Sequence, residues 1–136
     1  MRSLIFVAAV IIIIISCRSK ADVEFDQYYN QGEILYTSYC ANCHQKDGSG
    51  LALLYPPLNK SDFMDNNLEQ VLCIMRSGKT TPTVVNGKTF VQPMRGVAAL
   101  TDLDIAEIAT YIYNTWDHKR GIITVNEVTG KMKSCE

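Results

Sequence analysis

The chain has 136 residues, the size of a single domain, and 47% of them are hydrophobic. Its formal net charge is −1, from 13 basic and 14 acidic side chains. A nucleic-acid-binding protein needs a basic excess to neutralise phosphates, so the charge balance excludes that class.

The first residues have the pattern of a targeting signal. Arg2 gives a positive start, and Leu4–Ile15 is an unbroken apolar run of 12 residues. A membrane-spanning helix needs about 20 apolar residues, so this run is too short by that measure. We therefore predict that residues 1–16 are a signal peptide and that the mature chain lies outside the cytosol.

The end of this run resembles the lipobox of bacterial lipoproteins, in which two aliphatic residues and a small residue precede a cysteine. Here the residues are Ile14-Ile15-Ser16-Cys17. The resemblance implies a lipid anchor on Cys17 in the bacterial cell envelope, facing the periplasm, with residues 17–25 as a linker. An ordinary secretory signal or an uncleaved anchor, with Cys17 incidental, is the alternative.

A cysteine motif follows a helical pattern over residues 26–39. Cys40-Ala41-Asn42-Cys43-His44 has the form C-x-x-C-H, which is the attachment motif of a covalently bound c-type haem. Two thiols at this spacing can form thioethers with the two vinyl groups on one side of a porphyrin. His44 is then carried beneath the ring, where its imidazole can bind the iron. The motif predicts one covalent haem c.

Two other uses of a C-x-x-C pair fit less well. A thioredoxin-like redox pair would follow a strand in a βαβ pattern, whereas this pair follows a helix. A structural zinc site needs four ligands, and the remaining candidates, Cys73, His118 and Cys135, are scattered.

The pattern of residues 68–75 predicts an amphipathic helix that ends before Gly78. Met75 is predicted to be a core residue of this helix. Cys73 is predicted to be a buried free thiol, and a disulfide between Cys73 and Cys135 is the alternative.

The segment Val84–Val91 is predicted to form two short strands around Asn86-Gly87. This dipeptide is the strongest short-range signal of a β-hairpin. An irregular loop is the alternative.

Two capping patterns mark helix starts near the end of the sequence. Thr101 and Asp104 have the spacing of a capping box and precede an apolar stripe with helical period. Thr124 and Glu127 repeat the spacing, so the tail, residues 119–136, is predicted to hold one short helical turn.

Together these motifs resemble the class I c-type cytochromes, of the small monohaem kind found in bacterial envelopes. The resemblance covers residues 26–117, nearly the whole predicted domain of residues 26–118. In that family a glycine and an aromatic residue on the first helix cross the last helix at another aromatic, here Gly32, Tyr36 and Tyr111. The resemblance implies an all-α fold of three to four helices around one covalent haem, with the small β-hairpin preceding the Met ligand.

The resemblance also implies how the haem is held on the side of His44. The carbonyl of Pro56 would accept the second ring N–H of His44, with Pro57 as a near competitor for this role. Leu58 would pack on the haem face.

Met94 is the implied sixth ligand, because it lies in an irregular segment just before the last long helix, where the family keeps its ligand. His118 lies beyond that helix and is predicted to be a solvated surface residue. The other candidates are Met64, Met75 and Met132.

His44 and Met94 together saturate the iron and raise its reduction potential. The sequence therefore predicts an electron carrier without catalytic residues, which exchanges electrons with redox proteins of a respiratory chain and is attached to the membrane through Cys17. One alternative is a haem subunit of a dehydrogenase or oxidase complex. Another is a gas-binding sensor or a peroxidase, if Met94 is not a stable ligand.

Overall fold

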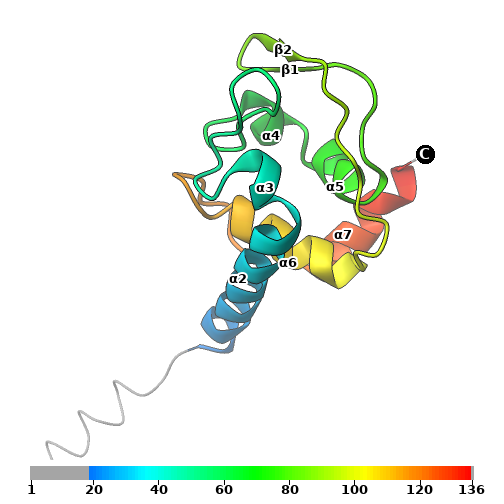
Figure 1. The fold of residues 1–136 in the computed structure, drawn as a ribbon. Coiled ribbons are helices and arrows are strands. Elements are labelled where there is room, and N and C mark those ends of the chain that lie inside the picture. Colours follow the sequence, from blue (N-terminus) through cyan, green and yellow to red (C-terminus); the bar gives the residue numbers. More distant parts are fainter. Residues whose placement is uncertain (1–18, 136) are drawn as a thin grey trace, which may run out of the picture.

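The computed structural model describes residues 19–135, so the predicted signal peptide and Cys17 lie outside the described part. The fold is mostly helical with one small antiparallel sheet, which confirms the predicted fold class. Figure 1 shows the hairpin at one end of the molecule and the start of α2 at the opposite end. The elements are α2 (Lys20–Tyr39), α3 (Ala41–His44), α4 (Asp62–Asn66), α5 (Leu68–Ser77), β1 (Thr83–Val85), β2 (Lys88–Phe90), α6 (Asp102–Ile112), α7 (Val125–Lys131) and a 3₁₀ turn (Met132–Ser134).

Helices α2 and α6 cross in close contact. Gly32 is buried at the crossing, and a Cβ at this position would overlap the backbone carbonyl of Glu107. Four residues further along α2, the ring of Tyr36 lies 5.4 Å from that of Tyr111 on α6. The predicted crossing at Gly32, Tyr36 and Tyr111 is confirmed. Since α3 follows directly from α2, this crossing positions the cysteine motif.

Helix α2 begins six residues earlier than predicted. Ser19 caps it, because its hydroxyl accepts a hydrogen bond from the backbone amide of Asp22 at 3.1 Å. The segment Lys20–Phe25 is therefore helical, and most of the predicted linker continues the rod of α2 (Figure 1). None of the helices in residues 19–135 is long and apolar enough to span a membrane.

The predicted hairpin is confirmed, with Thr83 paired to Phe90 and Val85 to Lys88. Asn86 and the glycine after it both have positive φ, as a two-residue turn of this type requires. The backbone amide of Asn86 donates to the Asp62 carboxylate at 2.7 Å, and the Asn86 side-chain carbonyl accepts from the Asp62 amide at 3.1 Å. The turn of the hairpin is thereby fastened to the start of α4.

The tail contains more helix than the single predicted turn. Thr124 caps α7 by accepting from the amide of Glu127, as its spacing predicted, and a 3₁₀ turn follows. Ile123 and Val128 have no exposed surface, and the hydroxyl of Thr110 on α6 exchanges hydrogen bonds with the backbone of Ile123. The tail thus packs on the face of α6.

The prediction that Cys73 is a free thiol is wrong. Cys73 on α5 and Cys135 after the 3₁₀ turn form a disulfide, with Cα atoms 5.4 Å apart. The packed tail explains the pairing, since it returns the chain to the flank of α5. Beside the disulfide, the hydroxyl of Ser134 donates to the carboxylate of Glu69.

Candidate functional site

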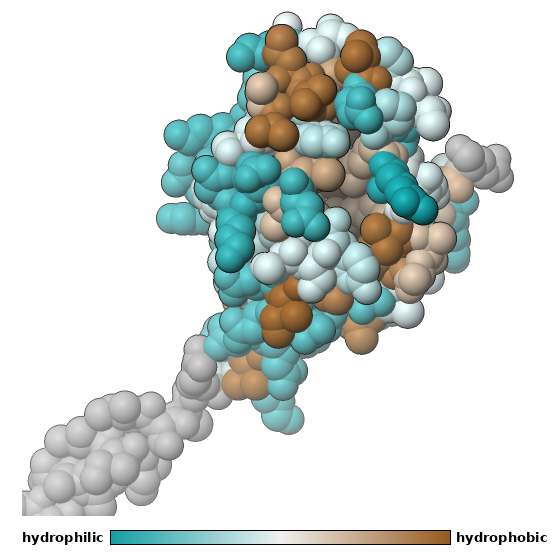
Figure 2. Space-filling model, viewed as in Figure 1, coloured by the Kyte–Doolittle hydropathy of each residue, from teal (hydrophilic) through white to brown (hydrophobic). Residues whose placement is uncertain are grey.

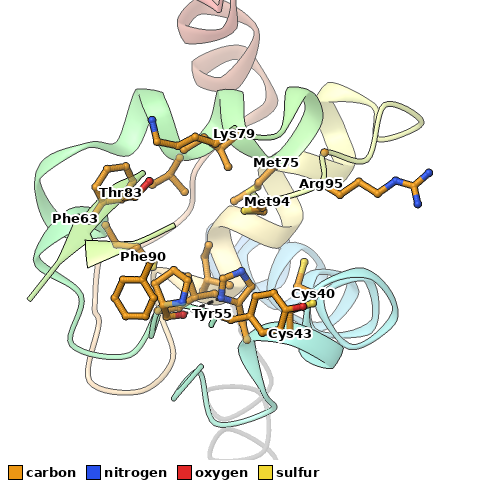
Figure 3. Close-up of a pocket in the computed structure, with 18 of the residues that line it drawn as sticks. Cys40, Cys43, Tyr55, Phe63, Met75, Lys79, Thr83, Phe90, Met94 and Arg95 are labelled. Carbon is orange, nitrogen blue, oxygen red and sulfur yellow. Dashed lines mark hydrogen bonds between the residues drawn. The ribbon is translucent and has the colours of Figure 1, made fainter. Parts of the chain in front are cut away.

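A cavity of about 690 Å³ lies between α3, α5, α6 and the hairpin. This volume is in the range of ligand and cofactor sites, about 300–1,000 Å³. The four residues predicted to hold the cofactor, Cys40, Cys43, His44 and Met94, all line it. In Figure 3, Cys40 and Cys43 lie on one side of the cavity and Met94 points into it from another.

His44 ends α3 and is buried, with 6% of its surface exposed. Its Nδ1–H donates to the carbonyl oxygen of Pro56 at 3.0 Å, which confirms the role predicted for Pro56 rather than Pro57. This bond fixes the tautomer and leaves Nε2 with a free lone pair. Burial lowers the pKa of His44, against the opposing effect of the Pro56 bond, and so favours the neutral imidazole that a metal requires.

The loop after His44 folds back over it. The backbone amide of Gly50 donates to the His44 carbonyl at 3.0 Å. Gly50 has a φ of 70°, and a Cβ there would overlap the carbonyl of Tyr55. The close approach of these backbones brings Pro56 to the imidazole.

Cys40 and Cys43 are free thiols, half-buried at the cavity wall. Cys40 follows the last residue of α2, and its amide donates to the Tyr36 carbonyl. Burial raises the pKa of the Cys40 thiol to about 12, and the neighbouring Cys43 adds to the effect. Both thiols are thus presented to the cavity, with Cys40 in the protonated form.

The segment that carries Met94 is fastened to the end of α5. The backbones of Met94 and Lys79 form an isolated β-bridge with two hydrogen bonds of 2.8 Å. Gly78 and Gly96 pack against each other, and a Cβ on either would overlap backbone atoms of the other segment. These contacts place Met94 at the cavity wall.

A family model described as cytochrome c oxidase, cbb3-type, subunit III matches residues 27–112. The chain belongs to this cytochrome c family. Membership implies a covalently bound haem c and a role in electron transfer.

Three relatives illustrate the similarity. The chain is 31% identical over 102 residues to the cytochrome c subunit of the quinone alcohol dehydrogenases of Gluconacetobacter polyoxogenes and Komagataeibacter europaeus, over 72% of this chain and 21% of each subunit. It therefore spans about a fifth of the length of those subunits. It is 27% identical over 81 residues to cytochrome c-552 of Thermus thermophilus, covering 57% of this chain and 62% of that protein.

The residues of this cytochrome c domain fit a haem c. The two thiols share one side of the cavity, one imidazole nitrogen is left free by the Pro56 bond, and a thioether enters from the Met94 segment. Most of the remaining wall is apolar, including Leu58 as predicted. Soft sulfur and imidazole nitrogen are ligands that suit haem iron.

Two further methionines of the domain line the cavity. Met64 on α4 and Met75 on α5 are buried, as core residues are, and both face the cavity as well (Figure 3 for Met75). Periodicity placed Met75 on the apolar face of its helix, but could not tell which part of that face would border a cavity.

The prediction that His118 is a solvated surface residue is wrong. Its side chain is 13% exposed. The His118 Nε2 lies 3.3 Å from the carbonyl oxygen of Leu58, and its Nδ1 lies 3.4 Å from a carboxylate oxygen of Asp65. His118 therefore connects the end of the domain to the cavity-lining segment around Leu58.

The hairpin end of the domain exposes large hydrophobic side chains (Figure 2). Leu53 and Leu54 lie in a tight turn beside the cavity residue Tyr55, and Val91 follows the cavity residue Phe90. Large apolar side chains are therefore exposed next to this part of the cavity.

Proposed function

We propose that this chain is a monohaem electron carrier. Cys40 and Cys43 would attach one haem c through thioethers, and His44 and Met94 would be its axial ligands. The bound haem supplies one-electron exchange between Fe(II) and Fe(III). The protein residues attach it, exclude water from it and set its reduction potential.

The observation that carries the proposal is the arrangement of two independently fixed ligands around one cavity. Pro56 orients His44 from one segment, and the bridge to Lys79 holds Met94 on another. Both residues are held by contacts that do not involve the cofactor. Such support positions a ligand in advance, so that less conformational entropy is lost when the metal binds.

Packing supports Met94 over the other methionines as the sixth ligand. Met64 and Met75 belong to the apolar core cluster, where their side chains contribute to stability. Met94 lies outside that cluster and is partly exposed. The Met94 side chain therefore contributes less to core packing than those of Met64 and Met75, which leaves its thioether available as a ligand.

Truncation of each methionine tests the assignment. Met94→Ala should allow the haem to bind CO readily and should lower its reduction potential, because the soft sulfur favours Fe(II). Met64→Ala and Met75→Ala are the matched controls. As core truncations they should lower the free energy of unfolding by about 2–5 kcal/mol. They should keep the absorption spectrum of the haem with both axial ligands bound. If a control variant lost this absorption spectrum and Met94→Ala kept it, Met94 would not be the sixth ligand.

A carrier without enzyme activity follows from two axial protein ligands, because no coordination position is left for a substrate. Among the described residues that line the cavity, none is Asp or Glu, so no carboxylate is placed there for acid–base catalysis. Wild-type protein should therefore bind neither CO nor cyanide rapidly. Rapid binding would favour the sensor or peroxidase instead.

Two settings fit a carrier of this kind. The relatives in quinone alcohol dehydrogenases favour a haem subunit of a dehydrogenase complex, and cytochrome c-552 favours a free carrier. Co-purification of the full chain in mild detergent separates them, because only a subunit stays with a larger oxidoreductase.

A lipid anchor on Cys17 would hold the protein at the membrane of the cell envelope. In this arrangement α2 is the connection between anchor and domain. Cys17→Ala should release the protein from the membrane fraction or leave the leader uncleaved. A correctly processed mutant that stays in the membrane fraction would exclude the anchor.

A further inference from the structure

We propose that Lys79, together with Thr81 and Thr83, forms a carboxylate-binding edge of the cavity that receives the propionate groups of the haem. This inference rests on the proposed attachment at Cys40 and Cys43. It assigns a role to the side chain of Lys79, whose backbone pairs with that of Met94.

The position of this edge follows from the chemistry of the cofactor. The two vinyl-bearing rings of the haem are adjacent, and the two propionate-bearing rings form the opposite side of the macrocycle. Thioethers at Cys40 and Cys43 therefore direct the propionates across the cavity, away from the cysteines. Figure 3 shows Lys79 and Thr83 on the side of the cavity away from Cys40 and Cys43.

The charges of the cavity wall suit a dianion. None of the described lining residues is Asp or Glu, and the cationic ones are Lys79 and Arg95. The Lys79 ammonium donates to the hydroxyl of Thr81 at 2.9 Å, which leaves two of its three N–H groups for other acceptors. Within residues 19–135, no carboxylate forms an ion pair with Lys79. A carboxylate of the cofactor would give it charge-assisted hydrogen bonds.

Backbone contacts fix this edge relative to the Met94 segment. Lys79 is held by its bridge to Met94, and Thr83 belongs to the paired strand β1. Both side chains therefore start from defined positions at the cavity wall. Arg95 is the competing cation, but in Figure 3 its side chain extends away from the cavity.

The test compares the haem-loaded full chain with variants of it. Lys79→Met keeps the length of the side chain and removes its charge and donors, and Thr83→Val removes a hydroxyl with little change of shape. Lys88→Met, on the neighbouring strand and outside the cavity lining, is the matched control for Lys79. Arg95→Met tests the competing cation.

The readouts are the propionate-bending band in the resonance Raman spectrum and the reduction potential. Lys79→Met should shift the band to lower frequency, since the propionates lose hydrogen bonds, and should lower the potential, since an unneutralised anion favours Fe(III). Thr83→Val should shift the band in the same direction, whereas Lys88→Met should leave the band and the potential unchanged. An unshifted band in both Lys79→Met and Thr83→Val would overturn the inference, and so would a band that shifts only in Arg95→Met.

Two controls separate this inference from the proposed function. If Lys79→Met yields too little holoprotein, Lys79→Arg, which keeps the charge, should restore the yield. The propionate-bending band of Thr83→Val then tests the inference. Wild-type protein must also keep its haem on a denaturing gel. Absence of covalent haem on the gel refutes the proposed function. Covalent haem with a propionate-bending band that does not shift in the variants refutes only the role of Lys79.

Discussion

The backbone amide of Met94 donates to the carbonyl of Lys79, and the amide of Lys79 donates to the carbonyl of Met94, each at 2.8 Å. Lys79 follows Gly78, which caps α5, and Gly96 packs on the last turn of the same helix. The amide of Val97 also donates to the carbonyl of Met75, at 2.9 Å. The segment with the proposed ligand is therefore held to the end of α5 by backbone contacts at Met94 itself and at Gly96 and Val97 just after it.

Gly96→Ala should disturb the Met94 ligand from a distance. Its new Cβ would overlap the amide of Gly78 and the carbonyl of Arg76, so the two segments must separate. We expect a loss of about 1–3 kcal/mol in the free energy of unfolding and faster CO binding. Chemical denaturation and CO titration measure these effects.

Gly130→Ala is the matched control for this change. Gly130 lies within α7, and no atom approaches a Cβ there within 4 Å. This substitution should raise stability by up to about 1 kcal/mol and leave CO binding unchanged. If Gly96→Ala behaves like this control, the Met94 segment does not depend on the glycine contact.

Replacement of both Cys40 and Cys43 by Ala should abolish covalent haem and prevent accumulation of the protein. A cavity of about 690 Å³ would then lose the group that fills it. Haem staining of a denaturing gel and an immunoblot report attachment and protein level. The double variant of Cys73 and Cys135 should still stain for haem, so it serves as the control. A folded, haem-free Cys40→Ala/Cys43→Ala protein would contradict this prediction.

Removal of the disulfide should lower stability without changing the haem site. Cys73 and Cys135 are separated by 62 residues in sequence. A cross-link that closes a loop of this length stabilises a protein by about 4 kcal/mol, through the reduced entropy of the unfolded chain. Cys73→Ala/Cys135→Ala should therefore unfold at lower urea concentration, with the ligand spectrum retained. Equal urea midpoints for the variant and the wild type would show that the cross-link carries no stability.

Acid should remove a contribution to stability that Asp102 makes at neutral pH. The Thr129 hydroxyl and the Arg76 guanidinium hold the pKa of Asp102 below its usual value. The folded state therefore binds this proton less readily than the unfolded state does. The contribution of Asp102 to stability is fully present above the pKa of the carboxyl in the unfolded chain, about 3.9. It is lost as the pH falls through the lower pKa of Asp102 in the folded state.

Asp102→Asn should accordingly be less stable than the wild type at neutral pH and should lose less stability on acidification. Urea midpoints from about pH 7 to about pH 3 measure both effects. Glu24→Gln, on an exposed part of α2, is the control for loss of a negative charge. If the urea midpoints of Asp102→Asn and of the wild type fell in parallel with pH, the Asp102 carboxylate would make no pH-dependent contribution to stability.

The parts that sequence predicted well are those in which the interacting groups are close along the chain. The Asn86 turn and the box of Thr101 and Asp104 each need four residues or fewer to form their defining contacts. The step from Cys40 to His44 is equally local. The pairing of His44 with Pro56 is longer in range, and a family resemblance was needed to predict it.

The parts that sequence missed depend on contacts between distant residues. Cys73 meets Cys135 only because α7 packs on α6, and His118 meets a carbonyl 60 positions earlier. No local pattern encodes either distance. The early start of α2 is different, since Ser19 and Asp22 have the spacing of a helix cap that the sequence already contained.

The disulfide places a condition on the maturation of this protein. For the proposed thioethers, Cys40 and Cys43 must be reduced thiols when they meet the haem, whereas Cys73 and Cys135 must be oxidised together. An envelope that oxidises thiols can pair any two of the four. In the export proposed from the predicted signal peptide, however, Cys40 and Cys43 would emerge well before Cys135. With the proposed export and attachment, the order of the cysteines along the chain would favour haem attachment before Cys135 arrives, so that the direction of the chain would help to prevent wrong pairing of the thiols.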